Sequence, residues 1–168
     1  FYCLEGKMDN QNYIQFIRSK VGDAKVILNA ACAVIVNERH EVLLQKRSDN
    51  HLWGLPGGLM ELDEAIVDTL IREVKEETNL DVFPTDFIGV FTNPNMRWRV
   101  SDEARVICFA FVAKIIGGEL RVNDSESSEL CYFCEDCLPK IHSIDNVQII
   151  QAYYQGKRNL IEGEKYHD

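Results

Sequence analysis

Three glutamates near the middle of the chain have the spacing of a metal site. Glu73, Glu76 and Glu77 stand at positions i, i+3 and i+4, so a helix would place their carboxylates on one side within a single turn. Like charges this close repel one another and destabilise a plain surface helix. A hard divalent cation would relieve that repulsion, since carboxylate oxygens are its preferred ligands. The pattern therefore predicts metal-assisted chemistry; a solvated acidic helix face is the alternative.

The residues around these glutamates predict a loop followed by a helix at the edge of the core. The glycine pair at 57–58 predicts an abrupt loop, because glycine permits backbone conformations and close approaches that other residues forbid. Apolar residues then recur every four positions, at Ile66, Leu70 and Val74, which is the stripe of a buried helix face. We expect a helix over about residues 62–78, with the carboxylates flanking this stripe.

The segment from Gly58 to Leu80 resembles the Nudix box, Gly-x5-Glu-x7-Arg-Glu-U-x-Glu-Glu-x-Gly-U, where U is a bulky aliphatic residue. The positions that fill this pattern are Gly58, Glu64, Arg72, Glu73, Val74, Glu76, Glu77 and Leu80. Asn79 stands where the family has glycine at the end of the helix. Asparagine is the next best residue for a left-handed conformation, so this departure is compatible with the motif. Eight specified positions at fixed spacing make the resemblance specific.

The Nudix resemblance implies which residues bind the metal. Glu76 and Glu77 would be ligands, and the carbonyl of Gly57 would be a further one. Glu73 would be either a ligand or the base that takes the proton from the attacking water. Magnesium, or manganese in its place, would then neutralise phosphate charge and activate that water.

The resemblance also implies roles for the other polar residues. Arg72 would orient Glu73 by hydrogen bonds, with a plain surface arginine as the alternative. Glu64 would support the loop and the helix, for instance by pairing with Arg72. Many family members use a further glutamate from a distant loop as the base. The candidates, each of which could instead be an ordinary surface acid, are Glu103, Glu126 and Glu129.

Basic and aromatic residues outside the box are candidates for substrate binding. Lys46 and Arg47 end a predicted strand near the glycine loop, where they would hold phosphate or simply be solvated. Aromatic rings stack on bases and arginine pairs with phosphate. On this basis the predicted wall of the base site consists of Trp53, Arg97, Trp98 and Arg99. Burial in the core is the alternative for Trp98.

Hydrophobic runs and turn signals predict one α/β domain. Strands are expected at residues 25–36, 41–46, 80–83, 87–91, 104–116, 119–122 and 129–134, with a polar loop at 92–103 and a closing helix at 144–155. Helices on each side of such strands imply a Nudix-type α/β/α sandwich with a mixed β-sheet. Residues 1–23 would be an N-terminal extension with a short helix capped by Asp9 or Asn10, residues 24–156 the Nudix domain, and residues 157–168 a polar, loose tail. Met8 is a candidate native start, which would make residues 1–7 an addition.

The net charge and the cysteine content limit which binding partners and which cellular compartment are expected. The net charge of −9 over 168 residues argues against stable nucleic-acid binding through a broad basic face. No apolar run is long enough to span a membrane. Cys32 and Cys108 lie in apolar runs and are predicted core residues. The triplet Cys131, Cys134 and Cys137 lacks an obvious fourth metal ligand, which argues against a metal site there. We expect a cytoplasmic protein, in which the thiols are reduced and form no disulfide.

These observations predict a metal-dependent hydrolase of nucleoside diphosphates linked to another group. The linked compound would be a nucleotide sugar, ADP-ribose, a dinucleoside polyphosphate or a (d)NTP, and a homodimer is left open. A non-catalytic Nudix module that senses a nucleotide is one alternative, but such a module would be expected to have lost box glutamates. An RNA 5′-end pyrophosphohydrolase is another alternative, which the acidic charge disfavours.

Overall fold

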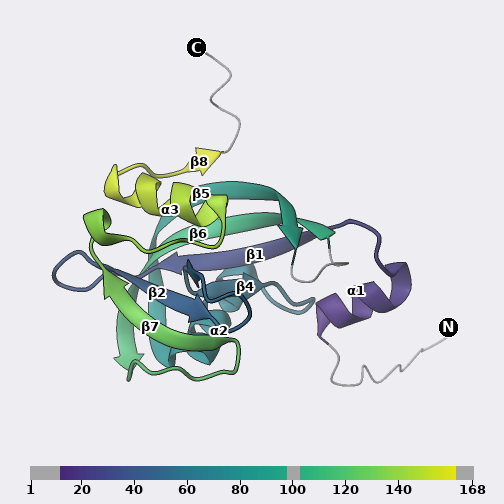
Figure 1. Ribbon diagram of the computed structural model, residues 1–168, viewed down its shortest axis with the longest axis horizontal. Helices are drawn as coiled ribbons and strands as arrows, with labels where there is room; N and C mark the ends of the chain where they lie inside the picture. Colours follow the sequence, from purple (N-terminus) through teal and green to yellow (C-terminus); the bar gives the residue numbers. More distant parts are fainter. Residues whose placement is uncertain (1–11, 98–102, 162–168) are drawn as a thin grey trace, which may run out of the picture.

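Two β-sheets and the helices around them make up the fold in the computed structural model, which describes residues 12–97 and 103–161 (Figure 1). The larger sheet has the strand order β4-β1-β6-β5-β8 and the smaller one β3-β2-β7. The strands are β1 (Val26–Val34), β2 (Val42–Arg47), β3 (Trp53–Gly54), β4 (Gly57–Leu59), β5 (Leu80–Arg97), β6 (Glu103–Gly118), β7 (Ser127–Phe133) and β8 (Leu160–Ile161). The helices are α1 (Tyr13–Val21), α2 (Ile66–Thr78), the 3₁₀ helix η1 (Glu135–Cys137) and α3 (Ile144–Tyr154).

Helices α2 and α3 cover opposite faces of the larger sheet. Successive side chains of a strand point to opposite faces, and β1 divides its residues in this way. Ala31 and Ala33 pack in one cluster with Leu70 and Val74 of α2. Cys32 and Val34 pack in another cluster, whose members from α3 are Ile149, Ile150 and Ala152. Strand β1 runs parallel to β6, and β5 runs antiparallel to it. The α/β/α sandwich and the mixed sheet are therefore confirmed.

The strands after α2 differ from the prediction. Strand β5 is continuous through Arg97, so the predicted loop at 92–103 is strand over its first half. A long ladder with β6 extends it, and register shifts at 84–86 and 93–96 absorb the irregularities near the two prolines. The predicted strand at 119–122 is absent. The backbone N–H groups of Arg121 and Asn123 instead donate to carbonyls at the end of α2, at 3.1 and 3.3 Å.

The boundaries of α2 agree with the sequence at one end only. The helix begins at Ile66, four residues later than predicted, because residues 60–64 form a turn in which the Glu64 carboxylate accepts the N–H of Glu61. It ends as expected, with Asn79 in the left-handed conformation at φ 62°.

The polar tail also differs from the prediction, since β8 pairs with β5 at Gly89 and Val90.

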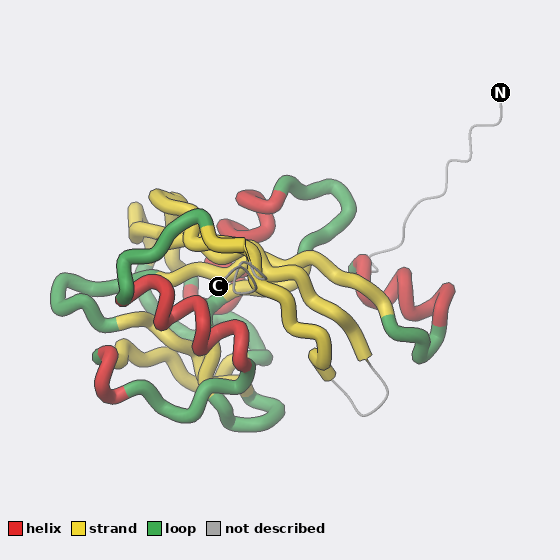
Figure 2. The backbone as a smooth tube through the Cα atoms, turned by 90° about the horizontal axis from the view of Figure 1, so that it is seen from above, coloured by secondary structure: helices red, strands yellow, loops and turns green. Residues whose placement is uncertain are grey.

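Helix α1 lies apart from the other helices, at the far ends of the long strands β1, β5 and β6 (Figure 2). It ends at Val21 before Gly22, as predicted. Its N-cap is Asn12, whose side chain accepts the N–H of Gln15 at 3.0 Å. The predicted caps Asp9 and Asn10 lie outside the described residues.

The cysteines follow the prediction in the core but not at η1. Cys32 and Cys108 are buried as expected, 5% and 4% exposed. The expectation of no disulfide is wrong, because Cys134 and Cys137 are bonded to each other. The tight turn of η1 brings their Cα atoms to 5.1 Å, a separation that a disulfide spans. Cys131 is free. None of the described helices has the length and apolar content needed to cross a membrane.

Candidate active site

Glu77 is a carboxylate enclosed by the fold. It is 5% exposed, and its Oε2 accepts the N–H of Gly57 at 2.8 Å. Burial raises the pKa of Glu77 well above its ordinary value, and hydrogen bonds from Gln45 and Gly57 oppose that rise. Gln45 is held in turn by Ser127, whose hydroxyl donates to its Oε1 at 2.6 Å. Strands β2 and β7 thus fix a glutamate that the sequence places on α2.

Glu73 lies one turn earlier, against the glycine loop. A side chain at Gly58 would overlap the carboxylate of Glu73, so only glycine leaves room for this acid in its observed position. Burial raises the pKa of Glu73 to about 7, while the hydrogen bond and the charge of Arg72 oppose the rise. The Arg72–Glu73 contact measures 2.8 Å.

Arg72 connects the acids of this region into one network. Its Nε and Nη2 donate to the two carboxylate oxygens of Glu64, the latter at 3.0 Å. Its Nη1 donates to Glu73, and to Glu76 at 3.2 Å, and Nη2 also donates to the carbonyl of Leu59 at 3.0 Å. The predicted pairs of Arg72 with Glu73 and with Glu64 are therefore present. Arg72 holds the β4 loop, the turn before α2 and the helix acids in a fixed relation.

These groups line a single open cavity of about 1160 Å³. Its walls come from α1, β1, β2, β4, α2, the segment before β7 and the start of α3. The sequence-predicted residues in its lining are Arg47, Gly57, Glu64, Arg72, Glu73, Glu76, Glu77 and Glu126. The box residues and one of the three distal glutamates thus meet at the same place.

The remaining predicted residues lie elsewhere. Trp53 packs edge-on against Phe133, with ring centroids 4.8 Å apart, beside the core cluster rather than in the cavity lining. Glu129 pairs with Lys46 at 3.4 Å. Glu103 begins β6, and neither it nor Glu129 is part of the lining. Arg47 does line the cavity, and its guanidinium forms an ion pair with Asp49 at 2.6 Å. The side chain of Arg97, and Trp98 and Arg99 entirely, lie outside the described residues.

The start of α3 contributes a wall that the sequence analysis missed. His142, Asp145 and Asn146 line the cavity, and none of them is a residue that the sequence analysis singled out. Asn146 is 7% exposed and its Oδ1 accepts the N–H of Leu55 at 2.7 Å. Burial lowers the pKa of His142, and the charge of Arg47 lowers it further. One pattern in the sequence could have indicated this wall. Asn146 precedes Ile149 and Ile150 by three and four residues, so a helix places its polar side chain on the same face as these apolar ones.

The acids of α2 fit a divalent cation by their chemistry. They supply hard oxygen donors, and a cation would compensate the cost of ionising Glu77 and Glu73 away from water. Within residues 12–97 and 103–161, no three ligating side chains converge as closely as a bound ion requires. Arg72 donates hydrogen bonds to Glu73 and Glu76, whereas Glu77 accepts the N–H of Gly57.

Comparison with known proteins agrees with this fold. The family model of the NUDIX domain matches residues 27–153. An ADP-ribose pyrophosphatase from Methanocaldococcus jannaschii is 32% identical, over 93% of this chain and 96% of its own. A putative 8-oxo-dGTP diphosphatase from Bacillus subtilis is 31% identical, over 77% of this chain and 82% of its own. A NUDIX hydrolase structure from Nitrosomonas europaea superposes with a TM-score of 0.68 at 22% identity, covering 80% of this chain and 93% of its own.

The fold and the cavity acids thus define an α/β/α hydrolase. The chain belongs to the Nudix family, as its box predicts, and it is a hydrolase that acts on phosphoric anhydrides.

Proposed function

We propose that the chain is a metal-dependent hydrolase that cleaves the diphosphate linkage of a nucleoside diphosphate joined to another group. Magnesium or manganese would be held by Glu73, Glu76 and Glu77, with the Gly57 carbonyl as a further ligand. The observation that carries this proposal is Glu77, a carboxylate 5% exposed whose pKa burial raises, at the wall of the cavity. When bound, the metal supplies charge neutralisation for the diphosphate and a more acidic water.

The other residues of the site would position and activate the reactants. Arg72 would hold Glu73 and Glu76 by the hydrogen bonds described above, and Glu64 would hold Arg72. Glu126 is the candidate for the distal base, because it alone among Glu103, Glu126 and Glu129 lines the cavity. A carboxylate there can accept a proton from water that attacks phosphorus.

The relatives and the charge of the chain favour one class of substrate. The relative named ADP-ribose pyrophosphatase matches over 93% of this chain, a span long enough to include residues before the family-model match begins. This favours a nucleotide carrying a second group. The net charge of −9 disfavours RNA ends as the substrate, and the intact box glutamates disfavour a sensing module without activity. A cytoplasmic location and a homodimer stay predictions.

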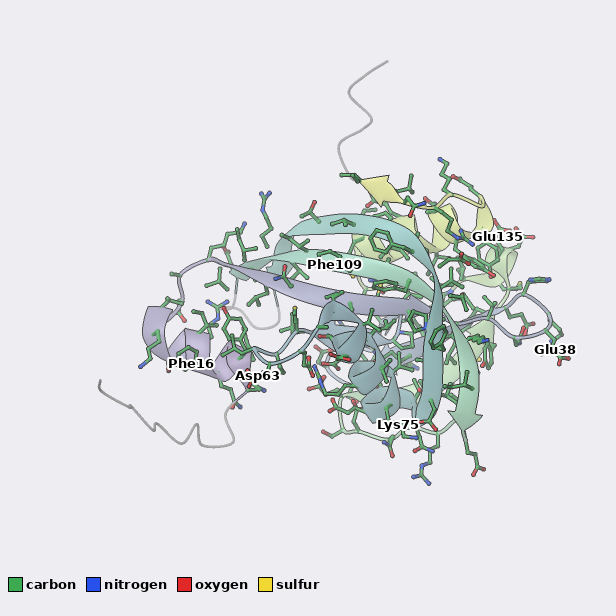
Figure 3. The ribbon with its side chains drawn as sticks, turned by 180° about the vertical axis from the view of Figure 1, so that it is seen from behind. Phe16, Glu38, Asp63, Lys75, Phe109 and Glu135 are labelled. Carbon is green, nitrogen blue, oxygen red and sulfur yellow. A yellow bond between two sulfur atoms is a disulfide. The ribbon has the colours of Figure 1, made fainter. Side chains whose placement is uncertain are left out.

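The test is Glu77→Gln, which keeps the shape of the side chain but removes its charge. We expect kcat to fall by roughly 100-fold or more, since a lost ligand removes several kcal/mol of transition-state stabilisation. Turnover is measured with magnesium on ADP-ribose, a nucleotide sugar, a dinucleoside polyphosphate and an oxidised dNTP. Glu38→Gln, in the exposed turn before β2, is the matched control and should leave kcat unchanged (Figure 3). Near-normal turnover by Glu77→Gln would contradict the assignment of Glu77 as a metal ligand.

A further inference from the structure

Helix α1 forms part of the wall of the active-site cavity although it precedes the region that the family model matches. The family match begins at residue 27, whereas α1 spans Tyr13–Val21. Four residues of α1 and its cap line the same cavity as the acids of α2: Asn12, Ile14, Gln15 and Arg18. This wall therefore lies outside the part of the chain that defines the family, and it is added to the site that the family fold forms.

The position of α1 against the domain is fixed by several contacts. Its first N–H, from Tyr13, donates to the carboxylate of Glu61 at 2.8 Å, where the positive end of the helix dipole also favours an acid. Tyr13 and Ile14 pack against a buried cluster made of Leu28, Ala30, Ala104 and Val106. In Figure 3, α1, which carries Phe16, lies beside the segment that carries Asp63. The helix can thus present a surface of fixed shape to a ligand.

The glycine segment continues from the contact with Glu77 to the first turn of α1. Gly57 binds Glu77, and Glu61 binds the first turn of α1. Glu61 lies four positions after Gly57, along a segment that pairs with β1 in β4 and again through the N–H of Met60. At about 3.3 Å per residue this separation is about 13 Å. A diphosphate on the metal acids would leave room beneath α1 for the group attached to it.

The chemistry of the α1 end suits a neutral, hydroxyl-bearing group better than further phosphate. Gln15 offers an exposed amide, and Ile14, Leu59 and Met60 are apolar. The Arg18 guanidinium donates to the carbonyls of residues 22, 24 and 103, at 3.1, 2.7 and 2.9 Å. The Glu61 carboxylate adds negative charge, which repels a phosphate and can accept hydrogen bonds from hydroxyl groups.

We propose that α1, through Gln15, and the segment at 59–61 form a subsite for the neutral sugar-like group of an X-linked nucleoside diphosphate. The subsite selects such compounds over nucleoside triphosphates, which have no group to place there. This inference rests on the proposed function and adds the substrate class to it.

The experiment compares matched substrates on variants of one helix position. Gln15→Ala keeps a strong helix former but removes the amide, and Gln15→Trp fills the space. ADP-ribose and UDP-glucose are the X-linked substrates, and ATP and UTP are their triphosphate counterparts. For the better X-linked substrate, kcat/KM should fall about three-fold with Gln15→Ala, the effect of one lost hydrogen bond, and about ten-fold or more with Gln15→Trp. The values for ATP and UTP should change by less than about two-fold.

Two controls separate binding from folding. Lys20→Ala alters an exposed residue of α1 that is absent from the cavity lining, and it should affect neither substrate class. Calorimetric binding of a non-hydrolysable α,β-methylene analogue of ADP-ribose should weaken in the Gln15 variants by the same factor as kcat/KM. Circular dichroism checks that the fold of each variant is retained.

The outcomes distinguish this inference from the proposed function. Equal losses on X-linked substrates and triphosphates, or no loss with Gln15→Trp, would overturn the subsite while leaving the hydrolase intact. Cleavage of triphosphates alone by the wild type would do the same. If the wild type with magnesium cleaves neither class, the proposed function itself fails.

Discussion

The acidic side chains around α2 have different properties because the fold gives each a different environment. Glu77 and Glu73 lose hydration, and this desolvation is the leading cause of the raised pKa of each. Glu64 shows the opposite shift, because the guanidinium of Arg72 lowers its pKa to about 2. The same residue type therefore supplies two poorly hydrated acids that a cation would stabilise and one acid, ionised at neutral pH, that holds Arg72.

The Glu64–Arg72 pair predicts a stability that depends on pH. Since the folded-state pKa of Glu64 lies near 2, below its ordinary 4.5, the ionised carboxylate stabilises the fold above about pH 4.5. That contribution is lost as the pH falls from about 4.5 toward 2. Urea unfolding of the wild type and Glu64→Gln in EDTA should differ by on the order of 1–2 kcal/mol near neutral pH, after allowance for solvent screening. The difference should shrink as the pH falls below about 4; a difference independent of pH would contradict the assignment.

The two loop glycines predict separate effects on catalysis and on folding. A methyl group at Gly58 would meet the carboxylate of Glu73, the movable end of a side chain, whereas one at Gly57 would meet the backbone of Ala31 and Cys32. Gly58→Ala should therefore displace Glu73 and lower kcat by about ten-fold or more, with little change in Tm. Gly57→Ala should instead destabilise the fold by about 2 kcal/mol or more. Kinetics and thermal melts of both variants check this, and a large fall in Tm for Gly58→Ala would speak against it.

At the scale of elements, short polar contacts join segments that are distant in sequence. The end of α2 receives backbone N–H groups from Arg121 and Asn123, which keeps the segment before β7 beside the helix acids. The residues that follow η1 pair with β3, since the N–H of His142 donates to the carbonyl of Trp53 at 2.8 Å. These contacts, together with the pairing of Arg47 with Ser127, bring Glu126 and His142 to the cavity.

The disulfide beside η1 predicts a local contribution to stability. Neither of its cysteines lines the cavity, so Cys134→Ser with Cys137→Ser should leave magnesium-dependent turnover nearly intact. Closing so short a loop stabilises the fold by at most about 2 kcal/mol in the chain-entropy view, so Tm should fall by up to about 6 °C. Thiol titration of the denatured protein should detect two more thiols after reduction in the wild type and none more in the double variant. Equal thiol counts with and without reductant in the wild type would show that the bond is absent.

At the scale of the whole molecule, the cavity lies where several layers meet. The Nudix fold supplies α2, the glycine loop and the start of α3, and α1, at the end of the molecule farthest from α3, adds lining residues (Figure 1). Its lining includes the carboxylates of Glu73 and Glu77, which the fold must hold away from water. Metal binding at these acids would therefore stabilise the whole folded chain.

This coupling predicts that magnesium raises the melting temperature. A ligand that binds only the folded state adds about 2.7 kcal/mol at a concentration of about 100 Kd, which corresponds to roughly 5–10 °C for a chain of this size. The increase should be present in the wild type, reversed by EDTA and largely lost in Glu77→Gln. Without metal, Glu77→Gln should melt no lower than the wild type, because it removes a buried charge. An equal magnesium shift in both proteins would contradict the assigned ligands.

Local features of the protein could be predicted from short stretches of its sequence. The spacing of Glu73, Glu76 and Glu77, the apolar stripe of α2 and the left-handed Asn79 depend on residues close together in the chain. Helix periodicity and caps arise from interactions within a few residues, so a pattern in the sequence reports them directly. The family and the α/β/α architecture followed from those features and are confirmed.

Tertiary structure decided which distant residues join the local motif. Gln45 reaches Glu77 because β2 lies beside it, Glu126 enters the cavity while Glu129 pairs with Lys46, and α1 contributes Gln15. The extension of β5 beyond Phe91 likewise accompanies its ladder with β6, in which Arg97 pairs with Glu103. Strand pairing and packing between remote segments fix these positions, and such contacts leave no periodic trace in the sequence because their partners lie far apart along the chain.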